Sequence, residues 1–398
     1  MNEQQTIEAA PRVHSIDALR GFSLFGILLA NLLIFQYGIF GKDHMDVFHL
    51  STLDRGAYDV VKIVIEGSFM PIFTFLFGFS VIKMAESLKR RHARPKWHIF
   101  RRGLLLIGAG SLHGYFIWEG DILSAYGIMS IFLLVFINRK PRTVLIAGCL
   151  LLIVYGALNY GAAEDMMQPK EGYVAEAIHV YQQGTYDEVR TFRTEGEAFD
   201  EATNEKLAFA MLFLPVFLAP MFLFGMYAAK KDYFADGLRE RSFYQKALVL
   251  IPIGWLMKAA GYYEWTNEWN SLLSEIGALV LAFGYIFAFV YVYTTRSEAI
   301  EMKAFEAVGK LSMTNYIMQS VIATFIFYGY GLGLFAKAGI IGGIGIGLLI
   351  YTAQCVISYW YLQHFKRGPL EVLMRIGTNL TWNGRVRSRQ PKVIREEQ

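Results

Sequence analysis

Cysteine and charge are both scarce in this sequence. Only two of its 398 residues are cysteines, Cys149 and Cys355, and 18% are charged, whereas 54% are hydrophobic. Two isolated cysteines form neither a disulfide framework nor a CxxC metal or redox pattern, so we expect no metal site. The net charge of +4 does not suggest nucleic-acid binding. A low fraction of charged residues together with a high fraction of hydrophobic residues is typical of a polytopic membrane protein.

Ten apolar segments are long enough to be membrane helices. The predicted spans are 18–38, 60–82, 99–118, 122–137, 143–161, 207–229, 244–262, 271–294, 311–329 and 338–362. The polar segment 1–17 has no basic region or cleavage site of a signal peptide, so the first span is expected to be retained. The sequence therefore predicts an all-α fold, with one transmembrane helix bundle over 18–362 and a basic tail over 363–398.

The distribution of lysine and arginine predicts the orientation. Residues 83–102 hold eight Lys and Arg against one acid, Glu86, which indicates a cytoplasmic loop. Counted from it, the even-numbered loops are basic and the odd-numbered ones are acidic or aromatic. Ten spans then place both termini in the cytoplasm, and we expect a bacterial plasma membrane protein embedded in the bilayer.

The segment 162–206 is the longest connection between predicted spans. It holds eleven acids and four bases and has too few bulky apolar residues for a core of its own. We expect one or two amphipathic helices lying over the external face.

Glycine and proline spacing indicates where helices pack closely or bend. Gly339, Gly343 and Gly347 recur every four residues, which predicts a close helix contact, either within the chain or in a homodimer. Pro71 and Pro252 lie in the second and seventh predicted spans, and Pro215 and Pro220 in the sixth. Each is expected to interrupt its span and free a carbonyl one turn earlier.

Three ionisable residues in or beside the spans are candidates for chemistry, because burying such groups in hydrocarbon is costly. His113 lies eleven residues after Arg102, about 16 Å along a helix, where an imidazole could act as a general base. The alternative is a neutral histidine that bridges helices. Glu66 could orient His113 or reach to water. Asp121 could also orient His113, or it could simply cap the next helix.

Other polar residues form a second group at the predicted cytoplasmic ends. Asp17 and Arg20 are three residues apart and are expected to pair on one helix face. The cations Arg20, Arg101, Arg102, Lys310 and the pair Lys366-Arg367 could converge on an anionic ligand such as a nucleotide phosphate, or contact anionic lipid. Asn31 and Asn315 supply further polar groups, which could also bridge helices.

Six short blocks spread over most of the chain carry a family resemblance. They are SIDALRGFSLFGILLAN at 15–31, FTFLFG at 73–78, LH at 112–113 followed by GDIL at 120–123, the segment 309–320 with its TNY core, FYGYGLGLF at 327–335 and GPLE at 368–371. By these blocks the chain resembles the YeiB-like family, also called domain of unknown function 418. More remotely, that family is similar to transmembrane acyltransferases such as the lysosomal heparan-glucosaminide acetyltransferase.

The resemblance implies a function. Those acyltransferases pass an acyl group from cytoplasmic acyl-coenzyme A, commonly acetyl-coenzyme A, to a sugar across the membrane. Here it implies transfer to a hydroxyl or amine of a sugar, lipid or small molecule, with His113 as base, the cations holding acyl-coenzyme A, and Asn31 and Asn315 steadying the oxyanion. The chain departs from the bacterial acyltransferases at Asn31, where they carry the catalytic His. The lysosomal enzyme has its His level with Ala57, so His113 is the intramembrane His left to serve.

Two other functions stay open. A transporter with five-plus-five inverted repeats would place Pro71 and Pro252 in equivalent helices, and a non-catalytic membrane scaffold needs none of these residues. A basic funnel leading to His113 would favour acyl transfer. A closed midplane cavity between pseudo-symmetric halves would favour transport.

Overall fold

The computed structural model describes residues 13–161, 168–201, 203–205, 211 and 213–386. Within these ranges all regular structure is helical, which confirms the predicted all-α fold. Residues 1–12 of the predicted N-terminal segment and 387–398 of the predicted tail lie outside the described residues, as do parts of 162–206 and 207–229.

Long helices dominate the chain. Those of the first part are α1 (His14–Tyr37), α2 (Thr52–Val60), α3 (Phe69–Arg90), α4 (Pro95–Phe116), α5 (Leu123–Phe132) and α6 (Pro141–Asn159). Two shorter helices follow, α7 (Tyr173–Gln183) and α8 (Tyr186–Glu195). The remainder are α10 (Leu214–Lys230), α11 (Gly237–Ala247), α12 (Leu250–Tyr262), α13 (Asn270–Arg296), α14 (Ile300–Lys310), α15 (Ser312–Phe327), α16 (Gly339–His364) and α17 (Pro369–Asn379).

Helices occur in all ten ranges predicted as spans. Among the described residues, five helical stretches are both long and apolar enough to cross a membrane: His14–Tyr37, Thr52–Arg90, Pro141–Asn159, Asn267–Arg296 and Gly339–His364. Leu123–Val135 and Leu214–Lys230 are apolar but shorter. Several apolar helices of membrane-spanning length therefore make this a membrane protein by composition.

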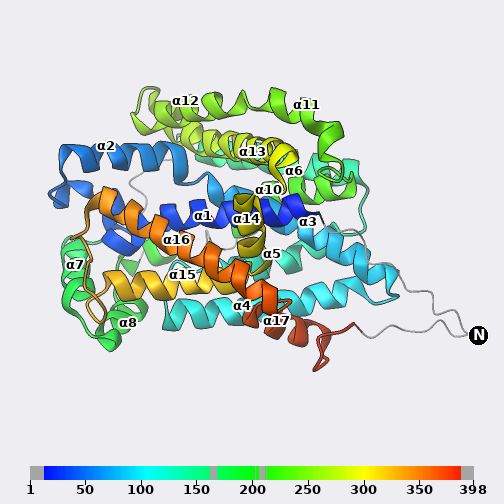
Figure 1. The fold of residues 1–398 in the computed structure, drawn as a ribbon. Coiled ribbons are helices and arrows are strands. Elements are labelled where there is room, and N and C mark those ends of the chain that lie inside the picture. The colour runs from blue at the N-terminus through cyan, green and yellow to red at the C-terminus, as the bar shows by residue number, and fades with distance from the viewer. Residues whose placement is uncertain (1–12, 162–167, 202, 206–210, 212, 387–398) are drawn as a thin grey trace, which may run out of the picture.

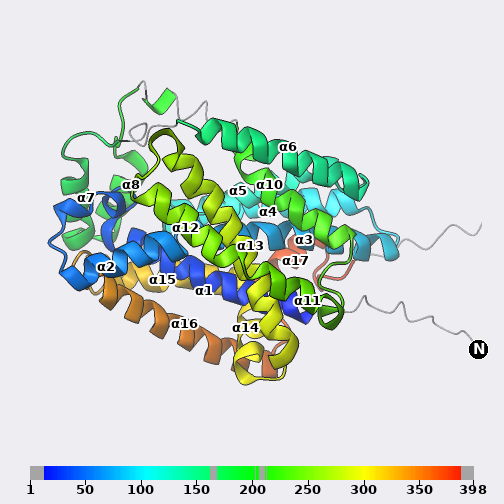
Figure 2. The same ribbon diagram turned by 90° about the horizontal axis from the view of Figure 1, so that it is seen from above.

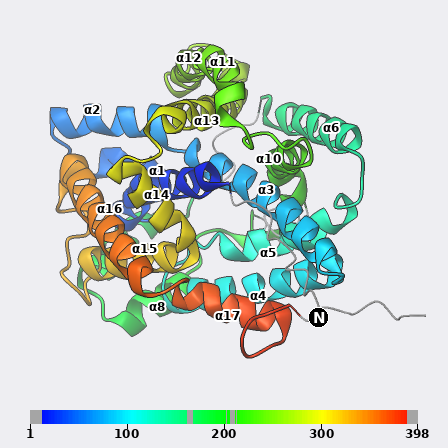
Figure 3. The ribbon, with the colours of Figure 1, turned by 45° about the vertical axis from the view of Figure 1, so that its right-hand side comes forward.

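The helices surround α1, which packs against α3, α14, α15 and α16 (Figures 1 and 2). The start of α1 and the helix α17 lie toward the same end of the bundle, whereas α2, α7 and α8 lie at the opposite end (Figure 1). We call the first the terminal end and the second the cap end. Figure 3 shows α17 crossing beside α4 at the terminal end, and these two helices are in contact.

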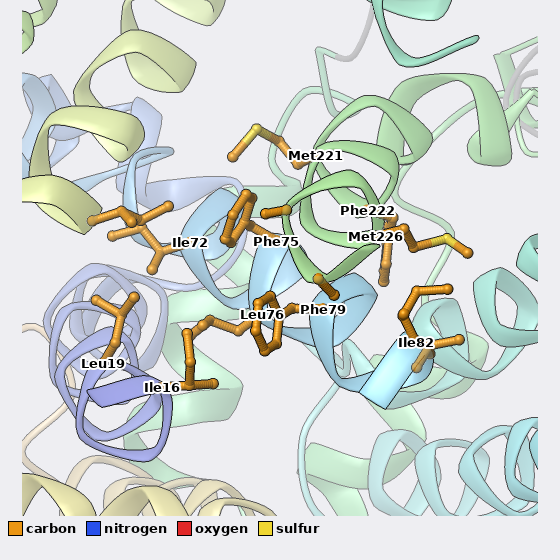
Figure 4. Close-up of a cluster of buried hydrophobic side chains, with 14 of the residues drawn as sticks. Ile16, Leu19, Ile72, Phe75, Leu76, Phe79, Ile82, Met221, Phe222 and Met226 are labelled. Carbon is orange, nitrogen blue, oxygen red and sulfur yellow. The ribbon is translucent and has the colours of Figure 1, made fainter. Parts of the chain in front are cut away.

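The largest hydrophobic cluster joins α1, α3 and α10. Figure 4 shows its centre, where side chains of these three helices interdigitate. Leu19, Ile72, Leu76 and Phe222 in this cluster are fully buried. This close packing fixes α1 and α3 against each other. It therefore also fixes the positions of the polar side chains elsewhere on these two helices.

Glycines allow α1 to approach its neighbours at backbone distance. A Cβ on Gly21 would overlap the carbonyl of Phe305, and one on Gly309 would overlap the carbonyl of Asp17, so α1 and α14 cross with no side chain between them. On α16, a Cβ on Gly343 would overlap the Gln36 side chain of α1. The predicted glycine contact therefore forms within the chain.

The prolines do not all act as predicted. Pro252 lies in the first turn of α12, and its predicted span breaks about one turn earlier, at Leu248–Val249 between α11 and α12. Pro71 likewise lies in the first turn of α3. The break in this region lies at Glu66–Ser68, between a turn of π-helix at Val61–Ile65 and α3, with Gly67 at a φ of 72°. Pro220 lies inside α10, which continues through it as one helix, so the interruption predicted there is absent.

The segment 162–206 contains the amphipathic helices α7 and α8. A capping box, in which Thr185 and Glu188 satisfy each other's backbone N–H groups, begins α8. Both helices lie against the turn between α4 and α5: Tyr181 donates to Glu119 at 2.9 Å, and Tyr186 donates to the carbonyl of Phe116 at 2.6 Å. They cover the cap end of the bundle.

Candidate functional site

The α4–α5 turn brings His113 and Asp121 together. His113 lies in the last turn of α4 and is 2% exposed, and its Nδ1 is 3.0 Å from Asp121 Oδ1. The other carboxylate oxygen of Asp121 accepts from the backbone N–H of Ser124 at 2.9 Å, in the first turn of α5. Asp121 thus combines the two roles considered for it, since it caps a helix and also holds the imidazole.

This geometry assigns the protons of the imidazole. An ionised carboxylate only accepts, so Nδ1 of His113 carries the hydrogen, and in the neutral imidazole Nε2 is then the nitrogen with the lone pair. Nε2 is buried and has no hydrogen-bond partner among the described residues. A buried, unpartnered basic nitrogen backed by a carboxylate can accept a proton from a substrate.

Tyr316 of α15 connects this pair to the interior of the bundle. Its ring lies 5.4 Å from the His113 ring between centroids. Its hydroxyl accepts from the N–H of Ile122 at 3.2 Å and donates to the carbonyl of Gly120 at 3.3 Å, on either side of Asp121. Tyr316 therefore fixes the turn that carries Asp121.

A cavity of about 370 Å³, which we call the inner chamber, lies on the other side of Tyr316. Its apolar wall comes from α3, α4, α5, α15 and the α4–α5 turn: Phe73, Phe77, Leu106, Ile122, Tyr126 and Tyr316. His113 is not among its lining residues, but Tyr316, which lines the chamber, lies against the imidazole. The chamber can hold an apolar chain close to His113.

A second cavity, of about 450 Å³, adjoins the inner chamber at the terminal end. We call it the basic mouth, because six cations line it: Arg91, Arg102, Lys310, Lys366, Arg367 and Arg375. The two cavities share Arg102, Lys310 and Glu371. In the described part of the chain, Arg102 has no ion pair with an acid, and its guanidinium lies 5.9 Å from the centre of the Phe77 ring.

Glu371 is the acid of the basic mouth, but its charge is already engaged. It accepts from the backbone N–H groups of Met313 and Thr314 at 2.9 and 3.0 Å and from the Thr314 hydroxyl at 2.7 Å. It therefore caps the N-terminus of α15 from the neighbouring α17. The cations around it retain an excess of positive charge suited to an anion.

Arg20 extends the cationic lining into the inner chamber. The predicted pair with Asp17 is present, at 3.1 Å, and the other end of the guanidinium donates to the Ser80 hydroxyl at 2.9 Å. Lys310 lines both cavities and pairs with Glu306 at 3.1 Å.

Not all the predicted site residues meet. Arg101 lines neither cavity, although it is next to Arg102. Glu66 lies near the cap end, where its carboxylate pairs with Lys42 and Lys62 at 2.7 and 2.6 Å rather than with His113.

The two asparagines also lie outside the cavity linings. Asn31 is part-buried on α1. Asn315 is buried between α15 and α16, where it donates to the Ser358 hydroxyl at 3.0 Å and to the carbonyl of Val308 at 3.3 Å. Asn315 therefore bridges helices in this structure.

Several residues that line the two cavities were not predicted from the sequence. Phe73 and Phe77 lie four residues apart on α3, Tyr126 follows on α5, and Arg375 comes from α17. The helical spacing of Phe73 and Phe77 was the available signal, but in an apolar helix it looks like ordinary packing. Among the described residues, no cluster of His, Cys, Asp and Glu is arranged to hold a metal ion.

Comparisons with known proteins find relatives along the whole chain. A family described as "Protein of unknown function (DUF418)" matches residues 228–381, which include Lys310, Tyr316 and Glu371. Over 399 residues the chain is 32% identical to YxaH, an uncharacterised protein of Bacillus subtilis, and the match covers 96% of this chain and 98% of that protein. The chain is 24% identical to YeiB of Escherichia coli, also uncharacterised, over 91% of its own length and 94% of that protein.

Proposed function

The chain belongs to the YeiB-like DUF418 family, and on that premise we propose that it is a membrane-embedded acyltransferase. It takes an acyl group, most simply acetyl, from acyl-coenzyme A and passes it to a hydroxyl or amine acceptor. The observation that carries the proposal is the path from the basic mouth through the inner chamber to Tyr316, behind which His113 and Asp121 are paired.

The two cavities suit the two parts of an acyl-coenzyme A. Phosphate groups favour arginine and lysine, and Arg102, Arg367 and Arg375 of the basic mouth have no acidic partner among the described residues. The narrower inner chamber, walled by Phe73, Phe77 and Tyr126, suits the less polar arm that ends in the thioester. A lipid head group would use the same cations, but it leaves the aromatic chamber behind them without a role.

The chemistry follows from the free nitrogen of His113. Nε2 takes the proton of the acceptor hydroxyl or amine while that atom attacks the thioester carbonyl carbon. The carbon–sulfur bond then breaks, and the sulfur of coenzyme A leaves with the proton that His113 holds. Asp121 stabilises the imidazolium between these steps.

The orientation is part of the proposal. With ten spans, the positive-inside rule puts the terminal end, where the basic mouth opens, on the cytoplasmic side of a bacterial plasma membrane. The cap end, with α7 and α8, then faces outward. Donor and acceptor would reach His113 from opposite sides.

Transport is the second candidate. The helix break at Glu66–Ser68 favours it, because interrupted helices often form transporter sites, and the buried Lys258 donates to the freed carbonyl of Glu66. The breaks at Glu66–Ser68 and Leu248–Val249, each about one turn before a proline, agree with it too. Against it, Glu66 and His113 have no counterparts in the second half of the chain beyond Lys258.

Binding of acetyl-coenzyme A to the purified protein tests the proposal. We expect the wild type to bind acetyl-coenzyme A. The affinity of Arg102→Ala should be lower by about tenfold or more, because this variant loses a charge-assisted contact. Arg101→Ala is the matched control, because its side chain is adjacent in sequence but lines neither cavity, and it should bind as the wild type does. His113→Ala should bind acetyl-coenzyme A but no longer release coenzyme A thiol.

Two results would contradict the proposal. One is a wild-type protein that binds no acetyl-coenzyme A at millimolar concentration. The other is a His113→Ala variant that releases thiol at the wild-type rate. Equal weakening by Arg101→Ala and Arg102→Ala would indicate a diffuse charge effect rather than a site.

A further inference from the structure

The helix α17 begins close to the end of a helix that is able to cross the membrane. That helix, α16, is long and apolar enough to span and ends at His364, and α17 begins at Pro369. The four residues between them reach at most about 14 Å. The start of α17 is therefore held near the membrane boundary at the terminal end, where Figure 3 shows it beside α4.

One face of α17 packs on the bundle. Met374 and Thr378 are buried, and a Cβ on Gly377 would overlap the Leu105 side chain of α4. Glu371 accepts from backbone N–H groups in the first turn of α15. Three of these residues, Glu371, Met374 and Thr378, also line the basic mouth. This inward face therefore fixes the helix and forms one wall of the mouth.

The opposite face of α17 is apolar and open. Pro369, Val372 and Leu373 are exposed, Leu373 to 62%, and Ile376 is half-buried beside them. Their spacing at i, i+3, i+4 and i+7 places all four on one side of the helix. A short helix with an exposed apolar face at the boundary of a bilayer is typical of a helix that lies in the membrane interface.

The turn after α17 displays a tryptophan. Trp382 is 94% exposed, although the turn that carries it is well bonded. Arg375 and Asn379 of α17 donate to the carbonyl of Gly384 at 2.6 and 2.8 Å, and the N–H of Gly384 donates to the carbonyl of Thr381 at 2.8 Å. A large ring presented in this way resembles the tryptophans that lie at membrane–water interfaces, where one part of the indole is in contact with lipid and the N–H is in contact with water.

The charges around the apolar face are positive. Lys366 and Arg367 precede α17, Arg385 follows Trp382, and all three cations are exposed. The one acid between residues 364 and 386 is Glu371, which lies on the inward face and is bonded to α15. Arg385 lines neither the basic mouth nor the inner chamber. Cations beside an apolar helix face fit a surface of anionic lipid, whose phosphates they contact.

We propose that α17 and the turn 380–386 form a lipid anchor, which lies on the membrane surface at the terminal end. Leu373 and Trp382 enter the head-group region, and Arg385 contacts the phosphates of anionic lipids. Anchoring does not require acyl transfer. It does place lipid against the outer side of a helix whose inner side walls the basic mouth, so the membrane supports that wall.

Fluorescence of the full-length protein in lipid vesicles tests the anchor. In a background with Cys149 and Cys355 replaced by alanine, Val372→Cys carries a nitrobenzoxadiazole label. The vesicles hold phosphatidylcholine, phosphatidylglycerol in increasing amounts, and a lipid with a nitroxide near its head group, which quenches the label at close range. We expect quenching that rises with the phosphatidylglycerol fraction. Glu298→Cys, whose side chain is 88% exposed between α13 and α14, is the control and should be quenched much less.

Two further substitutions, made together with the label at Val372→Cys, test the parts of the anchor. Arg385→Gln should raise the phosphatidylglycerol fraction needed for half-maximal quenching by about fivefold, because one cation near an anionic surface contributes about 1 kcal/mol. Trp382→Ser should reduce quenching at every lipid composition. Both side chains are exposed, so both variants should melt as the labelled parent protein does.

The results distinguish lipid from other occupants of this face. Equal quenching at Val372→Cys and Glu298→Cys would overturn the proposal, as would quenching at Val372→Cys that does not respond to phosphatidylglycerol. Label emission that depends on the protein-to-lipid ratio would overturn it in favour of a second copy of the chain. No coenzyme A is present in these measurements, so the acyltransferase proposal stands or fails separately.

Discussion

Asp121 is the residue at which structure and proposed chemistry meet. One carboxylate oxygen holds Nδ1 of His113 and the other caps α5, so a change at this position acts on both. The two contributions can be separated, because asparagine is as good a helix cap as aspartate but carries no charge. Only the charged form stabilises an imidazolium.

We therefore predict that Asp121→Asn retains the melting temperature and loses activity by about a hundredfold or more, since the imidazole loses its fixed tautomer and its counter-charge. Asp121→Ala should also lose about 1 kcal/mol of stability with the cap. Thermal melting and release of coenzyme A thiol measure the two effects. Full activity in Asp121→Asn would mean that His113 does not depend on this carboxylate.

The carboxyl group of Glu306 makes the stability of the fold depend on pH. Burial of Glu306 opposes its ionisation, but hydrogen bonds from Tyr293, His14 and Lys310 outweigh it and hold the pKa of Glu306 below its usual range. A lowered pKa stabilises the fold above the unfolded pKa of about 4.3, and this contribution disappears as the pH falls through the folded value.

The melting temperature of the wild type should therefore exceed that of Glu306→Gln by a constant amount above about pH 5. Below about pH 4 the difference should shrink. Melting curves of both proteins across this range make the comparison. A difference that grows toward acid pH would contradict the ionised state assigned to Glu306.

Among the helices, the crossing of α1 and α14 is the contact with the least tolerance. A Cβ on Gly309 would overlap the backbone carbonyl of Asp17, which cannot rotate away. Gly345 on α16 is the opposite case, because a Cβ there meets nothing within 4 Å. Both glycines lie within helices, Gly309 near the C-terminus of α14 and Gly345 inside α16, so the space around each Cβ position distinguishes them.

We predict that Gly309→Ala costs about 2 kcal/mol or more through overpacking, and that it displaces Asp17 and Arg20 with the helix. Gly345→Ala should leave stability unchanged or raise it by about 0.5–1 kcal/mol, because alanine is the better helix former. Thermal unfolding in detergent compares the two. Equal effects would show that the close crossing does not limit stability.

For the whole molecule, the orientation across the membrane is the testable property. In a background with Cys149 and Cys355 replaced by alanine, we place single cysteines at Asp187 on α8 and at Arg139, both exposed positions. An impermeant maleimide should label Asp187→Cys in intact cells and Arg139→Cys only after permeabilisation. The reverse pattern would invert the proposed orientation, and both variants should label once cells are opened.

The sequence predicted the elements well because apolar segments in a membrane protein have few alternatives to a helix. Helices occur in all ten predicted ranges, and the Asp17–Arg20 pair follows from spacing on one helix face. The break at Glu66–Ser68 falls about one turn before Pro71, where a proline removes a helical hydrogen bond, so it too was predictable from the sequence.

The candidate site was predictable only in part. His113 and Asp121 stand eight residues apart across one turn, so their meeting depends on local structure. Whether Arg101 or Arg102 faces the cavities depends on how α4 is rotated against α3 and α17. That rotation cannot be predicted from one sequence alone. A cavity at the cap end combines residues from α1, the α4–α5 turn, α7 and α8, whose proximity is purely tertiary.

Glu371 connects the terminal end of the molecule to the α4–α5 turn. It fastens α17, which walls the basic mouth, to the first turn of α15, the helix whose Tyr316 holds the α4–α5 turn with Asp121. We therefore expect a ligand in the basic mouth to act on Asp121 through this chain of contacts. Since such coupling is reciprocal, donor and acceptor would each raise the other's affinity by the same factor, and Glu371→Gln would reduce that factor for both.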